Sequence, residues 1–237
     1  MAFFINMFQF KQFTICQDRT AMKVGTDGVL LGAWADLENA CTILDIGTGT
    51  GLIALMAAQR NATAKIDAIE IETEAGKQAE ENISASLWAD RIKVYTVALQ
   101  TYVPQHPYDC IICNPPFFVN STLTPDNGRT LARHCTSLPH TELILHVKRL
   151  LKPNGHFCVI LPTEEARQAI TFAEKYHLYP QKITSVHPNP GKPAKRLLIK
   201  FVQQPISPDT DNLIVELSRH QYSEKYIQLT RDFYLKF

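Results

Sequence analysis

The sequence predicts an α/β fold in which helices cover both faces of a mostly parallel sheet. Strand-like and helix-like segments alternate through the middle of the chain, which is the pattern of a parallel sheet with crossover helices. A loop with three glycines joins the first of these strands to the following helix, at the strand end where open α/β sheets bind their ligands. These two observations indicate the fold class, and each element follows from its own pattern of apolar residues.

Residues 8–17 precede the alternating region and predict a small N-terminal strand or hairpin, because apolar and polar positions alternate there. Short apolar runs then predict strands, and longer amphipathic stretches predict the helices between them. The strands are expected at 41–46, 64–71, 91–97, 108–114 and 156–162, and the helices at 51–60, 72–86, 136–152 and 163–177. Pro153, Asn154 and Gly155 should close the helix that precedes the last of these strands.

Two strands without an intervening helix end the alternating region, at 179–188 and 194–203. Such a pair indicates that one of its strands runs antiparallel to the rest of the sheet. Two weaker elements follow at 211–217 and 223–237. The chain is expected to form one domain, 1–237, in which an N-terminal segment (1–35) and a C-terminal extension (205–237) flank a core (36–204).

The composition of the 237-residue chain is that of an ordinary globular protein, with 45% hydrophobic and 20% charged residues. A formal net charge of +1 excludes a strongly basic nucleic-acid coat, so any contact with nucleic acid must come from a local patch. Neither a signal peptide nor a membrane-spanning run is expected. The six cysteines are scattered, and several lie in apolar runs, which is typical of reduced, buried thiols in a cytoplasmic protein.

Cys110 and Cys113 have the spacing of a metal or redox pair. Both lie inside one apolar strand, and no second pair of cysteines accompanies them. Buried packing is therefore the expected role of these thiols, and no metal site is predicted.

The glycine loop LDIGTGTGL contains Gly47, Gly49 and Gly51, and glycine lets the backbone approach a ligand closely. Glu70 ends the next strand, at about the 20-residue distance expected of a carboxylate that holds ribose hydroxyls. The G-x-G-x-G spacing differs from the dinucleotide fingerprint and suits a nucleoside without phosphates. That spacing also disfavours a nicotinamide-dependent oxidoreductase.

The stretch CNPPFF follows the apolar strand that ends near Asn114. The residue before a proline is held in extended geometry, and the two prolines fix the turn while lacking N–H donors. The Asn114 side-chain oxygen and the Pro115 carbonyl are then rigidly placed hydrogen-bond acceptors at the strand end, and the aromatic Phe117 follows them. Preorganised acceptors of this kind act on a bound group by positioning and electrostatics.

Four stretches of the sequence carry a resemblance to known enzymes. LDIGTGTG with Glu70 resembles the AdoMet-binding motif of Rossmann-type methyltransferases, and NPPF resembles the catalytic motif of methyltransferases that act on adenine N6, cytosine N4 or glutamine N5. MKVGTDGVLLGAWA (22–35) and LTRDFYLKF (229–237) resemble the bacterial tRNA1(Val) adenine-N6 methyltransferase family. The resemblance implies a Rossmann-like fold with seven strands, one antiparallel, and methylation of an adenine in tRNA, adenine 37 of the anticodon loop.

The resemblance also implies roles for single positions. The target base would be held by Asn114, Pro115, Pro116 and Phe117. S-Adenosyl-L-methionine would be bound by Thr26, Asp27, Asp45, Gly47, Thr48, Gly49, Gly51, Glu70, Ala98, Leu99 and Asn114. Thr26 and Asp27 would close over it from a segment before the first helix. Ala98 departs from the family, which usually has an acidic residue there, so Leu99 and backbone groups would contact the cofactor adenine instead.

Basic residues near the expected site are candidates for contacts with tRNA phosphates. They are Lys11, Lys23, Arg129, Arg133, Lys192, Lys195 and Arg196. A monomer acting in the cytoplasm is expected. Two alternatives remain open, namely the same chemistry on rRNA, DNA or a protein glutamine, and a non-catalytic module that binds AdoMet or RNA. Glutamine is disfavoured because its methyltransferases usually carry a helical N-terminal domain and N-P-P-Y.

Overall fold

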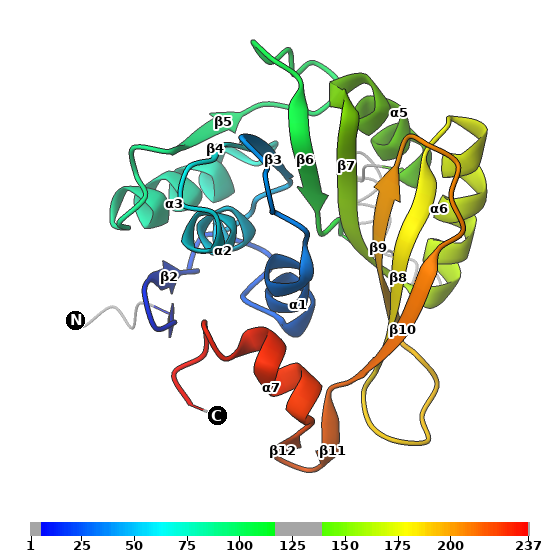
Figure 1. Ribbon diagram of the computed structural model, residues 1–237. Helices are drawn as coiled ribbons and strands as arrows, with labels where there is room; N and C mark the ends of the chain where they lie inside the picture. Colours follow the sequence, from blue (N-terminus) through cyan, green and yellow to red (C-terminus); the bar gives the residue numbers. More distant parts are fainter. Residues whose placement is uncertain (1–5, 117–138, 237) are drawn as a thin grey trace, which may run out of the picture.

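In the computed structural model, which describes residues 6–116 and 139–236, one large sheet forms the centre of the molecule (Figure 1). Its strands follow the order β10-β8-β9-β7-β6-β3-β4-β5. They are β3 (Thr42–Ile46), β4 (Lys65–Glu70), β5 (Ile92–Thr96), β6 (Tyr108–Cys113), β7 (Leu151–Pro162), β8 (Tyr179–His187), β9 (Arg196–Val202) and β10 (Asp209–Ile214). The helices are α1 (Thr26–Trp34), α2 (Leu52–Arg60), α3 (Thr73–Ser84), α5 (His140–Leu150), α6 (Thr163–Lys175) and α7 (Glu224–Thr230).

The sheet is mostly parallel, as predicted, and β9 runs antiparallel to both of its neighbours, β7 and β8. The other neighbouring strands of the sheet pair in parallel. The seven predicted strands are all present, and the described part of the chain adds an eighth, β10. This strand pairs with β8 from Asp209 opposite Lys182 to Ile214 opposite His187. The C-terminal extension therefore contributes an edge strand to the main sheet.

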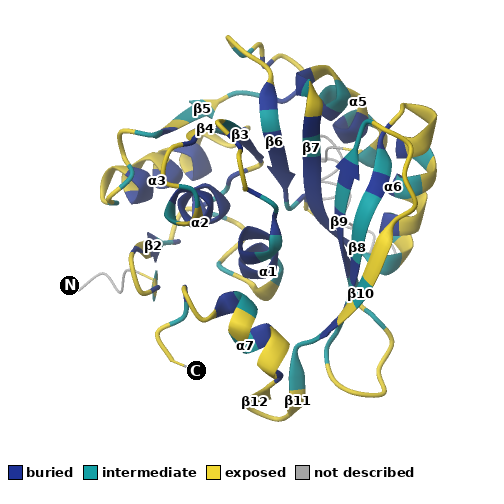
Figure 2. Cartoon of the chain, in the orientation of Figure 1, coloured by how far each residue is buried: buried dark blue, intermediate teal, exposed yellow. Residues whose placement is uncertain are grey.

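Helices cover both faces of the sheet: α1, α2 and α3 lie on one face, and α5 and α6 lie on the other (Figure 1). Two hydrophobic cores fill the space between the helices and the sheet. Adjacent strand residues divide between them, since Ile43 belongs to the first core and Leu44 to the second. Figure 2 shows this burial along the central strands, which is why their sequences read as continuous apolar runs.

The two ends of the described chain meet beside α1. The N-terminal segment forms a hairpin of β1 (Met7–Gln9) and β2 (Thr14–Cys16), and the C-terminal segment forms the hairpin of β11 (Glu216–Ser218) and β12 (Gln221–Tyr222), followed by α7. The backbone N–H of Lys11 donates a hydrogen bond to the carbonyl of Phe233 at 2.8 Å. The rings of Phe10 and Tyr234 stack with their centroids 5.9 Å apart.

The structure corrects two predictions about helix boundaries. Thr26 and Asp27 lie in the first turn of α1, and not in a segment before the first helix. Most residues of α1 are buried, so it lacks the amphipathic period that predicted the other helices. In addition, Pro153–Gly155 lies inside β7 and does not close α5. A Cβ at Gly155 would lie 2.7 Å from the Tyr108 carbonyl oxygen, so the glycine permits close approach at an irregularity in the strand pairing.

The cysteines of β6 face opposite sides of the sheet. Cys110 belongs to the first core and Cys113 to the second, so the two thiols do not form a pair. Both are free, as are Cys16, Cys41 and Cys158. Cys110 instead lies with His156 and Cys158, with the potential ligand atoms of the three residues within 4.8 Å of one another. Among the described helices, none is long and apolar enough to cross a membrane.

Candidate functional site

A cavity of about 830 Å³ lies at the carboxyl ends of strands β3, β4, β5 and β6. Strands β4 and β5 extend the sheet from one side of β3, and the chain then returns to place β6 on its other side. Ligands bind at such a reversal of strand order in open α/β sheets. The lining residues fall in five segments, namely 19–28, 46–53, 69–75, 97–100 and 113–116, although not every residue of each segment lines the cavity.

The loop between β3 and α2 turns its backbone toward this cavity. Gly47, Gly49 and Gly51 have φ angles of +68°, +57° and +82°, a conformation that favours glycine. A Cβ at Gly47 or at Gly49 would meet no atom within 4 Å, so both positions border open space. Gly51 lies outside the cavity lining, and a Cβ there would lie 3.4 Å from the side chain of Ile83.

Asp45 lies beneath the loop and does not line the cavity. Its side chain is buried, and its Oδ2 atom accepts a hydrogen bond from the Thr48 hydroxyl at 2.6 Å. The pKa of Asp45 is raised to about 7, chiefly by burial and to a smaller extent by the charge of Glu70, although the hydrogen bond from the Thr48 hydroxyl opposes the shift. The geometry gives Asp45 a direct role in holding the loop residue Thr48.

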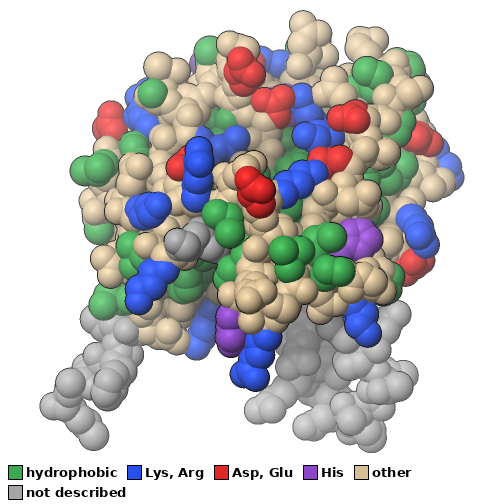
Figure 3. All heavy atoms as spheres, turned by 60° about the horizontal axis from the view of Figure 1, so that its bottom comes forward, with side chains coloured by type: hydrophobic (Ala, Val, Ile, Leu, Met, Phe, Trp, Pro, Cys, Tyr) green, Lys and Arg blue, Asp and Glu red, His purple; other side chains and the backbone are tan. Residues whose placement is uncertain are grey.

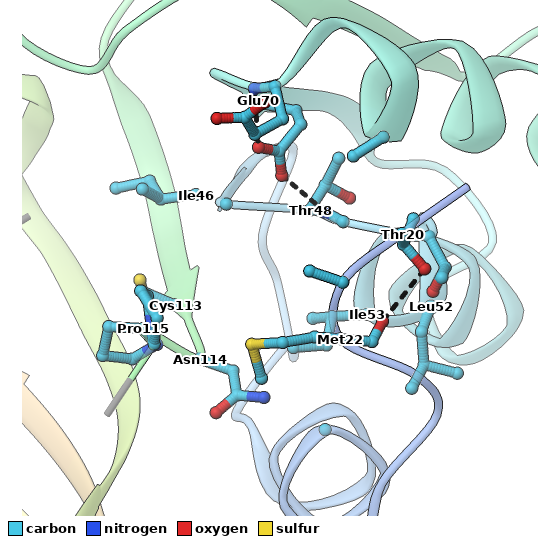
Figure 4. Close-up of a pocket in the computed structure, with 18 of the residues that line it drawn as sticks. Thr20, Met22, Ile46, Thr48, Leu52, Ile53, Glu70, Cys113, Asn114 and Pro115 are labelled. Carbon is cyan, nitrogen blue, oxygen red and sulfur yellow. Dashed lines mark hydrogen bonds between the residues drawn. The ribbon is translucent and has the colours of Figure 1, made fainter. Parts of the chain in front are cut away.

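Glu70 connects the glycine loop with the end of β4. Its Oε2 atom accepts from the Gly49 N–H at 2.9 Å, and its Oε1 atom accepts from the N–H groups of Ile71 and Glu72 at 2.9 and 3.0 Å. Figure 4 shows the Glu70 carboxylate reaching the loop beside Thr48. A carboxylate oxygen has two lone pairs, so Oε2 keeps acceptor capacity for a ligand hydroxyl in the cavity.

Asn114 follows the last residue of β6, and its amide projects from the strand end into the space near Met22 and Leu52 (Figure 4). The Oδ1 atom of Asn114 is buried and has no hydrogen-bond partner among the described residues. A Cβ placed on Gly28 of α1 would lie 3.8 Å from the Asn114 Nδ2 atom, which places this amide beside the first turn of α1. Pro115 is buried and Pro116 is exposed; both line the cavity, whereas Phe117 lies outside the described residues.

The turn after β5 meets the cavity through residues other than Ala98. Val97, Leu99 and Gln100 line the cavity, and Leu99 is buried. The Ala98 carbonyl accepts from the Thr101 N–H at 3.1 Å, which closes the turn. Ala98 itself is not among the residues that line the cavity, and its contact with a cofactor stays a prediction.

The segment 19–25 forms a wall of the cavity. Of these residues, only Lys23 had been predicted individually from the sequence. Arg19 is paired with Glu81 through two hydrogen bonds of 2.9 and 2.8 Å, and the Val24 N–H donates to the Gln17 side chain at 2.7 Å. Asn82 fixes the neighbouring β2 by donating to the Cys16 carbonyl, and it also donates to the Thr50 carbonyl of the glycine loop. The sequence signal for this wall was the segment 22–35, which begins inside it.

The predicted basic residues fall in different places. Lys23 lines the cavity together with Thr26 and Asp27. Lys195 and Arg196 line a second cavity on the other side of Asp27, and Arg196 donates to the Asp27 carboxylate at 2.7 Å. Lys11 donates to the Arg231 carbonyl, and Lys192 is exposed in the turn between β8 and β9. Arg129 and Arg133 lie outside the described residues.

The sequence matches a family model and several named proteins. Residues 25–175 match the model of the family described as "methyltransferase small domain". Proteins named "tRNA1(Val) (adenine(37)-N6)-methyltransferase" from Parabacteroides distasonis and Flavobacterium psychrophilum are each 48% identical to this chain. The alignments cover 97% of this chain in both cases, and 98% and 100% of the relatives, respectively.

A similar fold occurs in a solved structure titled as a predicted O-methyltransferase from Agrobacterium tumefaciens, with a TM-score of 0.68 and 20% identity. The match covers 87% of this chain and 96% of that one. A SAM-dependent methyltransferase from Aquifex aeolicus gives a TM-score of 0.51 with 17% identity, and the match covers 69% of this chain and 82% of that one. At these identities the two structures show a shared fold.

Proposed function

This chain belongs to the methyltransferase small domain family and, within it, to the family of tRNA1(Val) (adenine(37)-N6)-methyltransferases, and from that membership we propose its reaction. The enzyme transfers a methyl group from S-adenosyl-L-methionine to the N6 amino group of an adenine in tRNA. The substrate position is adenine 37 in the anticodon loop of tRNA1(Val), the position that the names of the relatives carry.

The buried, unpartnered Oδ1 atom of Asn114 is the single observation that carries this proposal. A buried acceptor without a donor is costly, and an exocyclic amine of a bound base would supply that donor. The Asn114 oxygen and the Pro115 carbonyl each accept one N–H of the adenine amine, which localises its lone pair. The two prolines hold both acceptors in place before the base arrives, so positioning and electrostatics do most of the catalytic work.

The cofactor fits the other end of the cavity. Gly47 and Gly49 border open space, so the backbone can approach the methionine part closely. Glu70 holds the ribose hydroxyls through its remaining acceptor capacity, and Leu99 provides an apolar surface for the cofactor adenine. Thr26 and Asp27 close the cavity from the first turn of α1. When bound, S-adenosyl-L-methionine supplies a methyl group on a sulfonium, which is already activated for transfer.

Two roles are indirect in this proposal. Asp45 and Gly51 shape the glycine loop from below, and they do not contact the cofactor themselves. We also propose that the enzyme is a monomer and acts in the cytoplasm. It needs no metal, because the methyl donor is already activated and the acceptors of the site need only position an amine.

Methyl transfer to tRNA tests the proposal. Purified protein is incubated with labelled S-adenosyl-L-methionine and with tRNA from a strain that lacks the enzyme, and the nucleosides are then identified by mass spectrometry. The expected product is N6-methyladenosine at position 37 of tRNA1(Val). A transcript with another base at that position is the control, and it should accept no label. Absence of label in every tRNA of that strain would overturn the proposal.

A further inference from the structure

A second cavity, of about 700 Å³, lies next to the first. The two share Thr26 and Asp27, so the first turn of α1 forms the wall between them. Elements from both ends of the chain line the second cavity, and they gather at the lower end of Figure 1. Figure 3 turns this end toward the viewer and shows Lys and Arg side chains lying among hydrophobic ones, with carboxylates interspersed.

Aromatic side chains line much of this cavity, namely Phe8, Tyr222, Tyr226 and Tyr234. Tyr222 and Tyr226 are stacked, with ring centroids 5.2 Å apart and planes inclined by 23°. Tyr226 is 3% exposed and fixed by its packing, whereas Tyr222 is 38% exposed. A buried ring that supports a more exposed one is a suitable platform for stacking a planar base.

The charged side chains of the cavity favour an anionic ligand. Three basic residues line it, Lys195, Arg196 and Lys236, together with two acidic ones, Asp27 and Glu216. Arg196 pairs with Asp27, so that carboxylate is already compensated. Lys195 and Lys236 are both exposed and can reach a phosphate group at the mouth of the cavity. Tyrosine rings together with lysines match the two components of a nucleotide, which are a planar base and a phosphate.

We propose that the second cavity binds a nucleotide of the RNA substrate that flanks the methylated adenine. This inference rests on the proposed function, because that function supplies a single-stranded RNA loop at the first cavity. Gly28 lies next to Asn114, and its neighbour Asp27 lines both cavities, so one helical turn separates the two sites. Bases of single-stranded loops are splayed out and stacked on aromatic side chains by RNA-binding proteins. A flanking base held in this way keeps the target adenine at Asn114.

Direct measurement of tRNA binding tests the inference, with Tyr222→Ala and Lys195→Ala as the variants. Tyr222→Ala should raise the Kd for tRNA about tenfold or more, because one base-stacking contact is lost. Lys195→Ala should weaken binding and reduce the slope of log Kd against log salt by about 0.7–0.9, which is the loss of one phosphate contact. Neither variant should change the Kd for S-adenosyl-L-methionine more than about twofold, which also reports that the variant is folded.

Tyr176→Ala and Lys175→Ala are matched controls. Tyr176 is 37% exposed and its ring lies 4.7 Å from that of Phe172, so it resembles Tyr222 in exposure and packing. Lys175 is exposed at the end of α6, and neither control residue lines either cavity. Both controls should bind tRNA like the wild type.

The outcomes separate this inference from the proposed function, because the Kd for tRNA is measured without methyl transfer. Equal tRNA affinity in Tyr222→Ala, Lys195→Ala and the control variants would overturn the inference even if the wild type methylates adenine 37. Loss of affinity in the first two variants alone would support it, even if no methyl transfer were found. As a second test, a photoreactive base is placed beside adenine 37, and the cross-linked peptide is expected to contain Tyr222.

Discussion

Asp27 and Arg196 lie 169 residues apart in the chain, and the Nε atom of Arg196 donates to the Oδ2 atom of Asp27 at 2.7 Å. The pair joins the first turn of α1 to the first residue of β9. From the sequence, Asp27 was predicted to contact the cofactor and Arg196 to contact tRNA. The ion pair joins these two residues at the wall between the cavities. Both side chains are partly exposed, at 25% and 30%, respectively.

A double-mutant cycle measures this connection. Asp27→Ala and Arg196→Ala should each lower the free energy of unfolding, and the coupling energy between them should be about 1 kcal/mol because the partners are in direct contact. The exposed pair Glu74 and Lys77, also 2.7 Å apart, serves as the control and should give at most about 0.5 kcal/mol. Urea denaturation gives both coupling energies. Additive losses of stability in Asp27→Ala and Arg196→Ala would contradict a stabilising ion pair.

Asn114→Ala should reduce kcat for tRNA methylation about 10²–10³-fold, as expected when a preorganised acceptor for the reacting group is removed. The Kd for S-adenosyl-L-methionine should stay within about twofold, because the Asn114 oxygen acts on the base. Single-turnover methylation and calorimetry give the two quantities. Asn154→Ala, an exposed position in β7 that lines neither cavity, is the control. A large loss of cofactor affinity with unchanged kcat would instead place Asn114 at the cofactor.

Glu70→Ala should raise the Kd for S-adenosyl-L-methionine about 10–100-fold. The substitution removes the acceptor for the ribose and the hydrogen bond from the Gly49 N–H, and hydrogen bonds to a charged group contribute about 1.5–3 kcal/mol. Glu70→Gln keeps one carbonyl acceptor and should give an intermediate Kd. Titration calorimetry measures both variants against Glu80→Ala, an exposed residue of α3 outside the cavity lining. Unchanged affinity in Glu70→Ala would remove this residue from the cofactor site.

Gly32→Ala should destabilise the fold by about 1–3 kcal/mol and lower Tm by about 2–4 °C for each kcal/mol. The new Cβ would lie 2.6 Å from the Met56 Sδ atom and 3.1 Å from its Cβ, where α1 packs on α2. Gly25→Ala is the control, since its Cβ would meet only the Lys23 carbonyl oxygen at 3.7 Å. Combining Gly32→Ala with Met56→Ala should relieve the overlap, so thermal unfolding of the double variant should show a non-additive loss.

The titration of Asp45 should make stability fall as the pH rises. Burial raises the pKa of Asp45 from its ordinary 3.8 to about 7, so the folded state binds a proton that the unfolded chain has already released in this window. The free energy of unfolding contributed by Asp45 therefore decreases between these two pKa values and is constant above them. Asp45→Asn lacks the titration, so its stability relative to the wild type should increase from about pH 5 to about pH 8. Urea denaturation at the two pH values decides the sign.

Local patterns were sufficient to predict the seven strands, because buried parallel strands read as apolar runs of limited length. The eighth strand, β10, was not predicted as part of the sheet. Its segment carries a weak pattern, and its position depends on a pairing with β8 that no local signal records. Helix α1 was not predicted because its residues are too uniformly apolar. Most of its residues are buried, including Val29, Leu30 and Leu31, and a helix buried on most sides has no polar face to reveal its period.

At the site, motifs at the ends of strands were predicted to lie together, and most of their described residues line one cavity. The loop residues Gly47 and Gly49, Glu70 and Asn114 end neighbouring strands and line one cavity. Three predicted cofactor residues do not line it, namely Asp45, Gly51 and Ala98, and each is one position from a lining residue. The phase of a strand end and the geometry of a turn decide which side chain faces a cavity, and a sequence motif does not contain this information.

Because the two chain ends contact each other, this part of the structure can form only after the whole chain has been synthesised. The hydrogen bond from Lys11 to Phe233 and the second cavity both require residues made first and residues made last. The glycine loop and the strands next to it, β3, β4 and β6, are synthesised before the C-terminal segment exists. A chain that lacks this segment cannot build the wall that combines Phe8 with Tyr222, Tyr226 and Tyr234. All described residues that line the first cavity precede position 117, so they are synthesised well before the residues that complete the second cavity.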